Sequence, residues 1–108
     1  MQTPTQGYHM KQVFLITYPT GKIYVGKDSV GSFRYFGSPS IEVVNEDMKK
    51  LPKETQMDYT VRKTILWESS SATEEELSRQ EVHFIRHYRS NEPSIGYNRW
   101  PRPLGTSR

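Results

Sequence analysis

Residues 13–27 read VFLITYPTGKIYVGK, and this stretch decides how the chain begins to fold. The first five residues favour strands, and the sequence YPTG at residues 18–21 has the composition of a turn. After the turn, Ile23 and Val25 alternate with Tyr24, which places the tyrosine on the opposite face of the second strand. The pattern therefore predicts a β-hairpin.

Three further elements are expected after the hairpin. Ser38 is placed like an N-cap, with a proline after it and apolar residues at near-helical spacing until Pro52, which predicts a short helix. Residues 58–68 alternate as a strand does, with Ile65 and Trp67 on one side. The third element is a helix that ends near residue 88 and begins with a capping box at residues 73–76.

The length of 108 residues is enough for one domain, expected at residues 10–100 between a disordered leader (1–9) and a flexible tail (101–108). The absence of cysteine excludes disulfides, thiolate zinc sites and a cysteine nucleophile. No apolar run approaches the roughly 20 residues of a membrane span, and no secretory signal opens the chain. We therefore expect a cytoplasmic protein without a membrane partner.

Charge is unevenly distributed along the chain. Residues 10–37 carry four basic side chains against one acidic, and residues 79–108 carry six arginines against two glutamates, whereas residues 38–78 have a net charge of −4. The two basic segments either fold into one positive face suited to a polyanion such as nucleic acid or contribute to a mixed surface.

Glu81 is the residue of the last helix whose position demands an explanation. At 100° per residue it falls inside the apolar stripe formed by Leu77, Phe84, Ile85 and Tyr88. Burying an unpaired carboxylate costs several kcal/mol, so a compensating group or a polar cleft is needed. Two explanations remain open, a structural salt bridge and a ligand for a hard cation such as Mg²⁺.

Two residues near the hairpin have similar alternatives. Tyr24 is followed closely by Gly26, which lets a backbone or ligand approach, although a hairpin tyrosine is ordinarily a packing residue. Arg34 stands among aromatic residues, where its guanidinium either stacks on rings as surface packing or reaches a phosphate.

Taken together, five motifs resemble the GIY-YIG nuclease family over residues 11–100. The motifs are the hairpin with Tyr24-Val25-Gly26, then Arg34 at the spacing of the family's catalytic arginine, the aromatic-led strand YTVRKTIL at residues 59–66, Glu81 followed by Phe84-Ile85 and Tyr88, and the closing Ile95-Gly96-Tyr97-Asn98.

The resemblance implies an α+β fold, a small three-stranded antiparallel sheet flanked by helices, and hydrolysis of DNA phosphodiesters with one Mg²⁺ or Mn²⁺ per site. It implies that Glu81 holds the metal and that Arg34 stabilises the transition state. Tyr24, with Lys27 nearby, would deprotonate or orient water. Asn98 would brace the site, although an asparagine that caps a turn is the ordinary alternative.

DNA is the expected partner, and two alternatives stay open: the substrate is structured or nonspecific DNA, or a partner protein supplies targeting. The basic residues expected to contact DNA are Lys22, Lys27, Arg34 and Arg99.

The first tripeptide of the family corresponds here to Gln12-Val13-Phe14, so the first tyrosine lacks its hydroxyl. Tyr18 lies four residues on in the same strand register and is a candidate substitute. The alternative hypothesis is a catalytically weak or inactive module that binds nucleic acid on the same scaffold.

Overall fold

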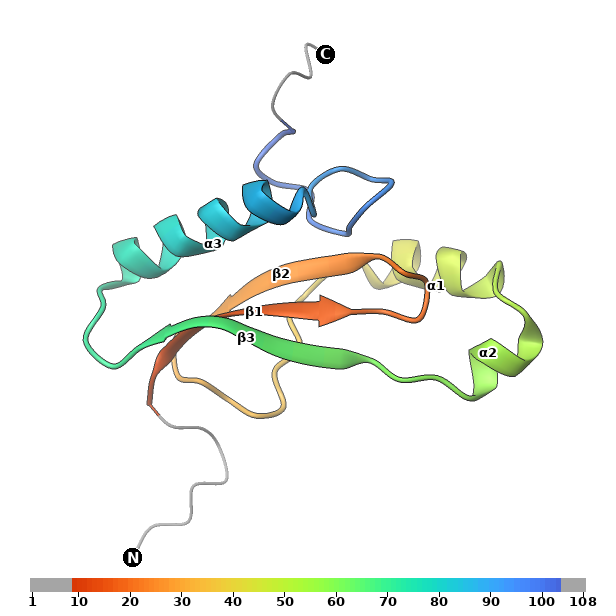
Figure 1. The fold of residues 1–108 in the computed structure, drawn as a ribbon, viewed down its shortest axis with the longest axis horizontal. Helices are drawn as coiled ribbons and strands as arrows, with labels where there is room; N and C mark the ends of the chain where they lie inside the picture. Colours follow the sequence, from red (N-terminus) through yellow and green to blue (C-terminus); the bar gives the residue numbers. More distant parts are fainter. Residues whose placement is uncertain (1–8, 104–108) are drawn as a thin grey trace, which may run out of the picture.

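The computed structural model of the chain describes residues 9–103. Its elements are β1 (Lys11–Thr17), β2 (Ile23–Asp28), α1 (Ile41–Lys49), α2 (Lys53–Met57), β3 (Arg62–Ser69) and α3 (Glu74–Tyr88). The strands form one antiparallel sheet in the order β2-β1-β3 (Figure 1). The α+β prediction of a three-stranded antiparallel sheet with helices is confirmed. Most of the predicted leader, residues 1–8, and residues 104–108 of the predicted tail lie outside the described part.

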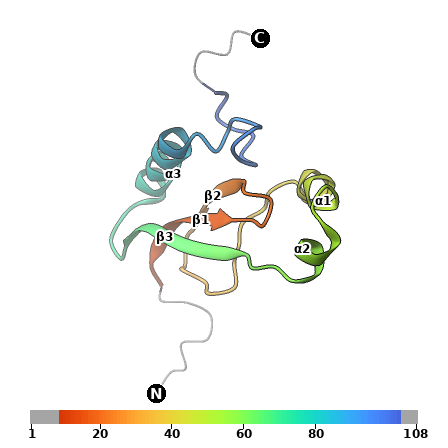
Figure 2. The same cartoon turned by 45° about the vertical axis from the view of Figure 1, so that its right-hand side comes forward.

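Helix α3 covers one face of the sheet and forms the core with it (Figure 2). Leu77 and Ile85 on α3 are buried against Val13, Leu15 and Val25 of the hairpin. Full burial of an aliphatic side chain of this size stabilises a fold by roughly 1.5–3 kcal/mol, so this cluster fixes α3 against β1 and β2. The predicted capping box is also confirmed, because the side chains of Thr73 and Glu76 each accept a backbone N–H at the start of α3.

The opposite face of the sheet is covered by the loop at residues 29–40. The carboxylate of Asp28 accepts two backbone N–H groups at the start of this loop, which turns the chain beneath the sheet. Farther along, Lys63 Nζ donates to the carbonyls of Ser32 (3.0 Å) and Tyr35 (2.6 Å). The ring of Phe14, 0% exposed, packs edge-on against Tyr35. The loop is therefore fastened to the strands at several points.

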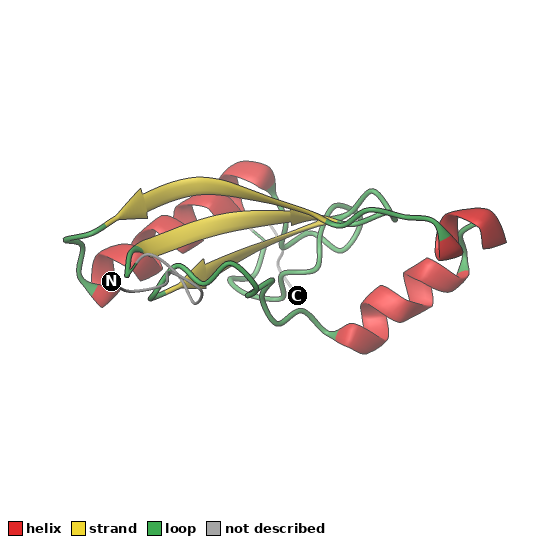
Figure 3. Cartoon of the chain, turned by 90° about the horizontal axis from the view of Figure 1, so that it is seen from below, coloured by secondary structure: helices red, strands yellow, loops and turns green. Residues whose placement is uncertain are grey.

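Helices α1 and α2 lie beyond the end of the sheet where the β1–β2 turn is (Figure 3). The N-cap of α1 is Ser40, whose hydroxyl accepts the N–H of Val43, so the prediction of Ser38 as N-cap was wrong. The residues directly after Ser38 are not helical, and the chain does not turn helical until residue 41. The short helix α2 after Pro52 was not predicted.

A β-bulge in β3 alters the predicted faces of that strand. Trp67 pairs with Val13, but Ile65 pairs with Phe14, so Leu66 is the extra residue. Paired residues share a face, and Trp67 therefore packs against the core while Ile65 lies on the other face and is exposed. The prediction that Ile65 and Trp67 share one side was wrong, because strict alternation assumes an unbroken register.

No helix within residues 9–103 is long and apolar enough to span a membrane.

Candidate functional site

The open edge of β2 is closed by residues 95–98, which run parallel to it. The Ile23 N–H donates to the Ile95 carbonyl at 3.1 Å, and the Tyr97 N–H donates to the Ile23 carbonyl at 2.8 Å. Pairing of this kind satisfies backbone groups that an edge strand would otherwise expose. The segment that resembles the family's closing motif thus becomes part of the sheet edge.

Asn98 extends this pairing with its side chain. Its Oδ1 accepts the Val25 N–H and its Nδ2 donates to the Val25 carbonyl, both at 2.8 Å. The side-chain amide therefore imitates a strand backbone, as the bracing role predicted for Asn98 requires, and it fixes the position of residues 99 and 100.

Asn98→Asp is expected to destabilise the protein by about 2 kcal/mol. A carboxylate keeps the bond from the Val25 N–H but faces the Val25 carbonyl with a second acceptor, and a partly buried group left without its hydrogen bond costs about 1–3 kcal/mol. Chemical denaturation measures the change. Asn45→Asp, on the exposed surface of α1, is the matched control, and equal losses in the two variants would contradict the role given to Asn98.

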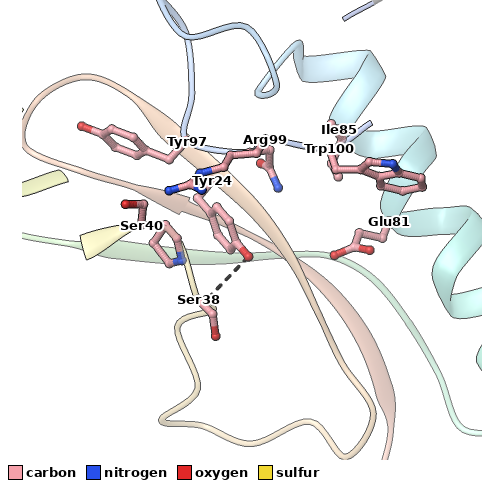
Figure 4. Close-up of a pocket in the computed structure, with 10 residues that line it drawn as sticks. Tyr24, Ser38, Ser40, Glu81, Ile85, Tyr97, Arg99 and Trp100 are labelled. Atoms are coloured by element: carbon pink, nitrogen blue, oxygen red, sulfur yellow. Dashed lines mark hydrogen bonds between the residues drawn. The ribbon is translucent and has the colours of Figure 1, made fainter. Parts of the chain in front are cut away.

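A pocket of about 420 Å³ lies between this closed edge, α3 and the end of the 29–40 loop (Figure 4). Its lining residues come from four separate segments: Tyr24, Ser38, Pro39, Ser40, Glu81, Ile85, Tyr97, Asn98, Arg99 and Trp100. The structure thus brings Tyr24, Glu81 and Asn98 to one pocket, whereas Arg34, which the resemblance groups with Tyr24 and Glu81, does not line it.

Glu81 is half-buried in this pocket and makes no hydrogen bond or ion pair with any residue from 9 to 103. Burial raises the pKa of its carboxyl above the ordinary value, and the nearby Lys27 ammonium partly offsets the rise. Of the two explanations given for an inward-facing Glu81, the structural salt bridge is not formed with any residue that the structure describes. The carboxylate is directed at the cavity, where its oxygens can accept a donor or coordinate a cation.

Tyr24 reaches the same pocket from β2, and its hydroxyl accepts the Ser38 N–H at 3.4 Å. Burial raises the pKa of Tyr24, the Ser38 contact lowers it, and the charge of Glu81 adds to the rise. The phenol therefore stays protonated at neutral pH. With one lone pair directed at Ser38, its proton is available to a group in the cavity, so Tyr24 is suited to donate a hydrogen bond.

Gly26 and Gly37 make room for this arrangement of rings. A Cβ at Gly26 would stand 2.8 Å from Phe14 Cε1 and 3.1 Å from Tyr24 Cε2, and a Cβ at Gly37 would stand 2.9 Å from Tyr24 Cδ2. The ring of Tyr24 is consequently held between two glycines. Gly37 also adopts a φ of +85°, a conformation that L side chains rarely adopt.

The donor set fits only one class of metal site. No three His, Cys, Asp or Glu side chains in the described part of the chain are placed so that they could hold a metal ion together, so an all-protein cage for Zn²⁺ or Ca²⁺ does not fit. Mg²⁺ usually keeps several waters and is held by one or two carboxylates together with substrate phosphates. The single unpartnered carboxylate of Glu81 suits that mode of binding.

Lys22 is engaged within the protein. Its Nζ lies 2.9 Å from Asp47 Oδ2, which also accepts the Tyr97 hydroxyl at 2.8 Å, and the Tyr97 hydroxyl lies 2.8 Å from Thr20 Oγ1. Burial, followed by the hydrogen bond to Asp47, raises the pKa of Tyr97 to about 12 despite the opposing Thr20 contact. This network joins α1 to the β1–β2 turn, and it leaves Lys22 less available to a phosphate than the sequence suggested.

The remaining predicted residues differ in whether they line the pocket. Arg34 is exposed in the turn of the 29–40 loop and does not line the pocket, whereas Arg99 does. Lys27 donates to Ser78 Oγ at 2.7 Å. Tyr18 packs edge-on against Tyr97, with ring centroids 5.3 Å apart, and does not line the pocket either. The hydroxyl that Phe14 lacks is thus not replaced there by that of Tyr18.

Sequence reasoning missed the contribution of Ser38, Tyr97 and Trp100 to the pocket. Tyr97 belonged to the closing motif, and that signal could have placed it near the site. Ser38 and Trp100 enter the pocket only through the path of the loop and the turn after α3, for which the sequence offered no periodic signal.

Comparisons with protein-family models, with curated proteins and with solved structures give no match for this chain.

Proposed function

We propose that the protein is a divalent-metal-dependent DNA endonuclease of the GIY-YIG type. The observation that carries the proposal is the unpartnered carboxylate of Glu81 in a cavity that also holds the Tyr24 hydroxyl and borders the Arg99 side chain. A cation-holding carboxylate, a hydrogen-bond donor and a guanidinium are groups that phosphodiester hydrolysis requires close together.

Each side chain has a distinct part in this proposal. Glu81 would hold one Mg²⁺ or Mn²⁺ at the α3 side of the pocket. Tyr24, protonated at neutral pH, would donate its hydrogen bond and so orient the attacking water or a phosphate oxygen. Arg99, exposed at the rim, would bind the phosphate, and Asn98 would keep β2 and the rim in register. When bound, the cation would supply charge neutralisation at the phosphate.

The proposal is tested by nicking of supercoiled plasmid with the purified full chain. Nicking that requires Mg²⁺ or Mn²⁺ and stops in EDTA supports the endonuclease. A protein that retards DNA on a gel but leaves it intact with either cation would overturn it.

A specific observation favours the second candidate, a catalytically weak or inactive binding module. Phe14 occupies the position of the family's first tyrosine, its ring is fully buried, and Tyr18 does not bring a replacement hydroxyl to the pocket. Retardation of DNA without nicking is the result that this alternative predicts, with affinity falling as salt increases.

Arg99→Ala is expected to reduce nicking more than Arg34→Ala. Loss of one donor to the transition state typically lowers the rate by about 10²–10³-fold, and of the two arginines only Arg99 lines the pocket. Arg34→Ala, the matched control on the exposed loop, is expected to weaken DNA binding slightly. Initial nicking rates at saturating cation decide the comparison, and a greater loss in Arg34→Ala would return the catalytic role to the residue that the family resemblance implies.

A further inference from the structure

Residues 99–102, Arg-Trp-Pro-Arg, place an exposed indole at the rim of the pocket. Trp100 is 66% exposed, yet it lines the same cavity as Glu81. Figure 4 shows its indole on the α3 side of the pocket, near Ile85 and Glu81. A large aromatic side chain presented to water beside a polar cavity has a surface available for a ligand, because the indole makes no ring contact with any described residue.

The backbone that carries this indole is anchored. Pro101 is buried, and its carbonyl accepts the side-chain N–H of Asn91 at 2.6 Å. On the other side, both amide atoms of Asn98 are bonded to Val25. Trp100 therefore projects from a segment fixed at Asn98 and at Pro101, although the sequence placed residues from 101 onward in a flexible tail.

Arginines stand on both sides of Trp100 in the sequence. Arg99 and Arg102 line a second hollow of about 600 Å³, which shares Ser40, Tyr97, Asn98 and Arg99 with the first pocket. Neither guanidinium forms a hydrogen bond or an ion pair within residues 9–103. Two acidic side chains are engaged elsewhere, since both oxygens of Glu92 accept from Arg89, at 2.6 and 2.9 Å, and Asp47 is bonded to Lys22. In the pocket that Trp100 lines, Glu81 is left without such a partner among residues 9–103.

An exposed indole on a segment whose two guanidinium groups make no hydrogen bond or ion pair within residues 9–103 suits a nucleobase with its phosphates. In duplex DNA the face of each base is covered by its neighbours, so a protein ring can stack only on a base that is single-stranded or extruded. We propose that Trp100, with Arg99 and Arg102, is a stacking site for an unpaired nucleotide beside the pocket. The preferred substrate is then DNA with single-stranded or unpaired nucleotides next to the cut. This inference rests on the proposed function for its place beside the cleavage site.

The binding part is tested by fluorescence in EDTA, where no cleavage intervenes. Trp67→Phe leaves Trp100 as the only tryptophan. Titration with a short oligothymidylate is expected to quench its emission, and a blunt duplex of the same length is expected to quench it much less. Equal quenching by the two probes, or none by oligothymidylate, would overturn the proposal.

Affinity measurements with variants separate stacking from charge. Trp100→Ala is expected to bind oligothymidylate about tenfold more weakly and the duplex as before, with Trp100→Phe restoring most of the loss. Arg102→Ala is expected to weaken both probes and to reduce the salt dependence by about one counterion. Thermal melting of each variant controls for folding. An unchanged affinity of folded Trp100→Ala for oligothymidylate would overturn the stacking site.

The two proposals fail separately. Plasmid nicking with Mg²⁺ but no selective quenching removes the stacking site and retains the endonuclease, whereas selective quenching without nicking retains the stacking site on a binding module.

Discussion

Glu81→Gln is expected to abolish nicking while making the protein more stable at pH 7. Glutamine has the same shape but cannot provide a charged oxygen ligand. Because changes even in the outer partners of metal ligands cost about 10–100-fold, loss of the ligand itself should lower the nicking rate by at least about 10²-fold. Initial rates at saturating Mg²⁺, for wild type and variant side by side, measure the effect.

The gain in stability follows from the raised pKa of the Glu81 carboxyl. A carboxyl whose pKa is higher in the folded state than in the unfolded state destabilises the fold progressively as pH rises from the ordinary value of 4.5 through the folded value. At pH 7 the wild type carries this destabilisation in full and Glu81→Gln does not. Near pH 4 the wild-type carboxyl is mostly protonated, so the difference between the two proteins should nearly vanish.

Thermal melting in EDTA at the two pH values tests this expectation without a contribution from bound metal. Glu42→Gln, on the exposed surface of α1, is the matched control and should give no gain at pH 7. A Glu81→Gln protein that nicks at the wild-type rate, or that melts lower than wild type at pH 7, would contradict the assignment of Glu81 as an unpartnered, cation-holding carboxylate.

Gly96→Ala is expected to destabilise the fold by about 3 kcal/mol and to lower activity with it. The added Cβ would collide with the Ser90 carbonyl and stand 2.6 Å from both the Ile23 carbonyl and Ser90 Cα, all of them backbone atoms. Overpacking typically costs about 1–3 kcal/mol, and backbone obstacles place this site at the upper end. Displacing residue 96 also moves Asn98 and with it the rim of the pocket.

Gly21→Ala is the matched control, because it makes the same chemical change in the β1–β2 turn. Gly21 has a φ of +88° with nothing within 4 Å of an added Cβ, so only the left-handed backbone is penalised, by about 1 kcal/mol. Urea denaturation of both variants gives the loss of stability in each, and the difference between them is the part caused by the backbone atoms close to residue 96. Similar losses in the two would show that residues 95–98 do not press against β2 as described.

The sequence predicted those elements whose signals lie within a few residues of each other. The hairpin and the capping box of α3 depend on local composition and on contacts three residues apart, and both were confirmed. The bulge at Leu66 was missed because it is a property of the pairing between two strands, which the alternation of one strand does not contain.

For the candidate site too, the sequence indicated the residues that regular helices and strands position, but not those that a loop positions. The helical spacing of α3 predicted that Glu81 faces inward, and strand alternation predicted that Tyr24 lies on the face opposite Ile23 and Val25. In the structure Glu81 and Tyr24 line the pocket, while Val25 and Ile23 pack in the core. The position of Arg34 could not be predicted, because the 29–40 loop takes its path from contacts with Lys63, which is 28 residues or more away in the chain. Spacing along the sequence does not determine where such a loop directs one exposed side chain.

The parallel pairing of residues 95–98 with β2 joins segments 73 residues apart through only a few hydrogen bonds. These hydrogen bonds can break together in a subglobal fluctuation while the α3 core stays folded, because each cooperative unit of a protein has its own opening free energy. When they break, Arg99 and Trp100 separate from Tyr24, and the cavity loses one wall. On heating, the hollow beside Glu81 is therefore expected to come apart before the sheet melts.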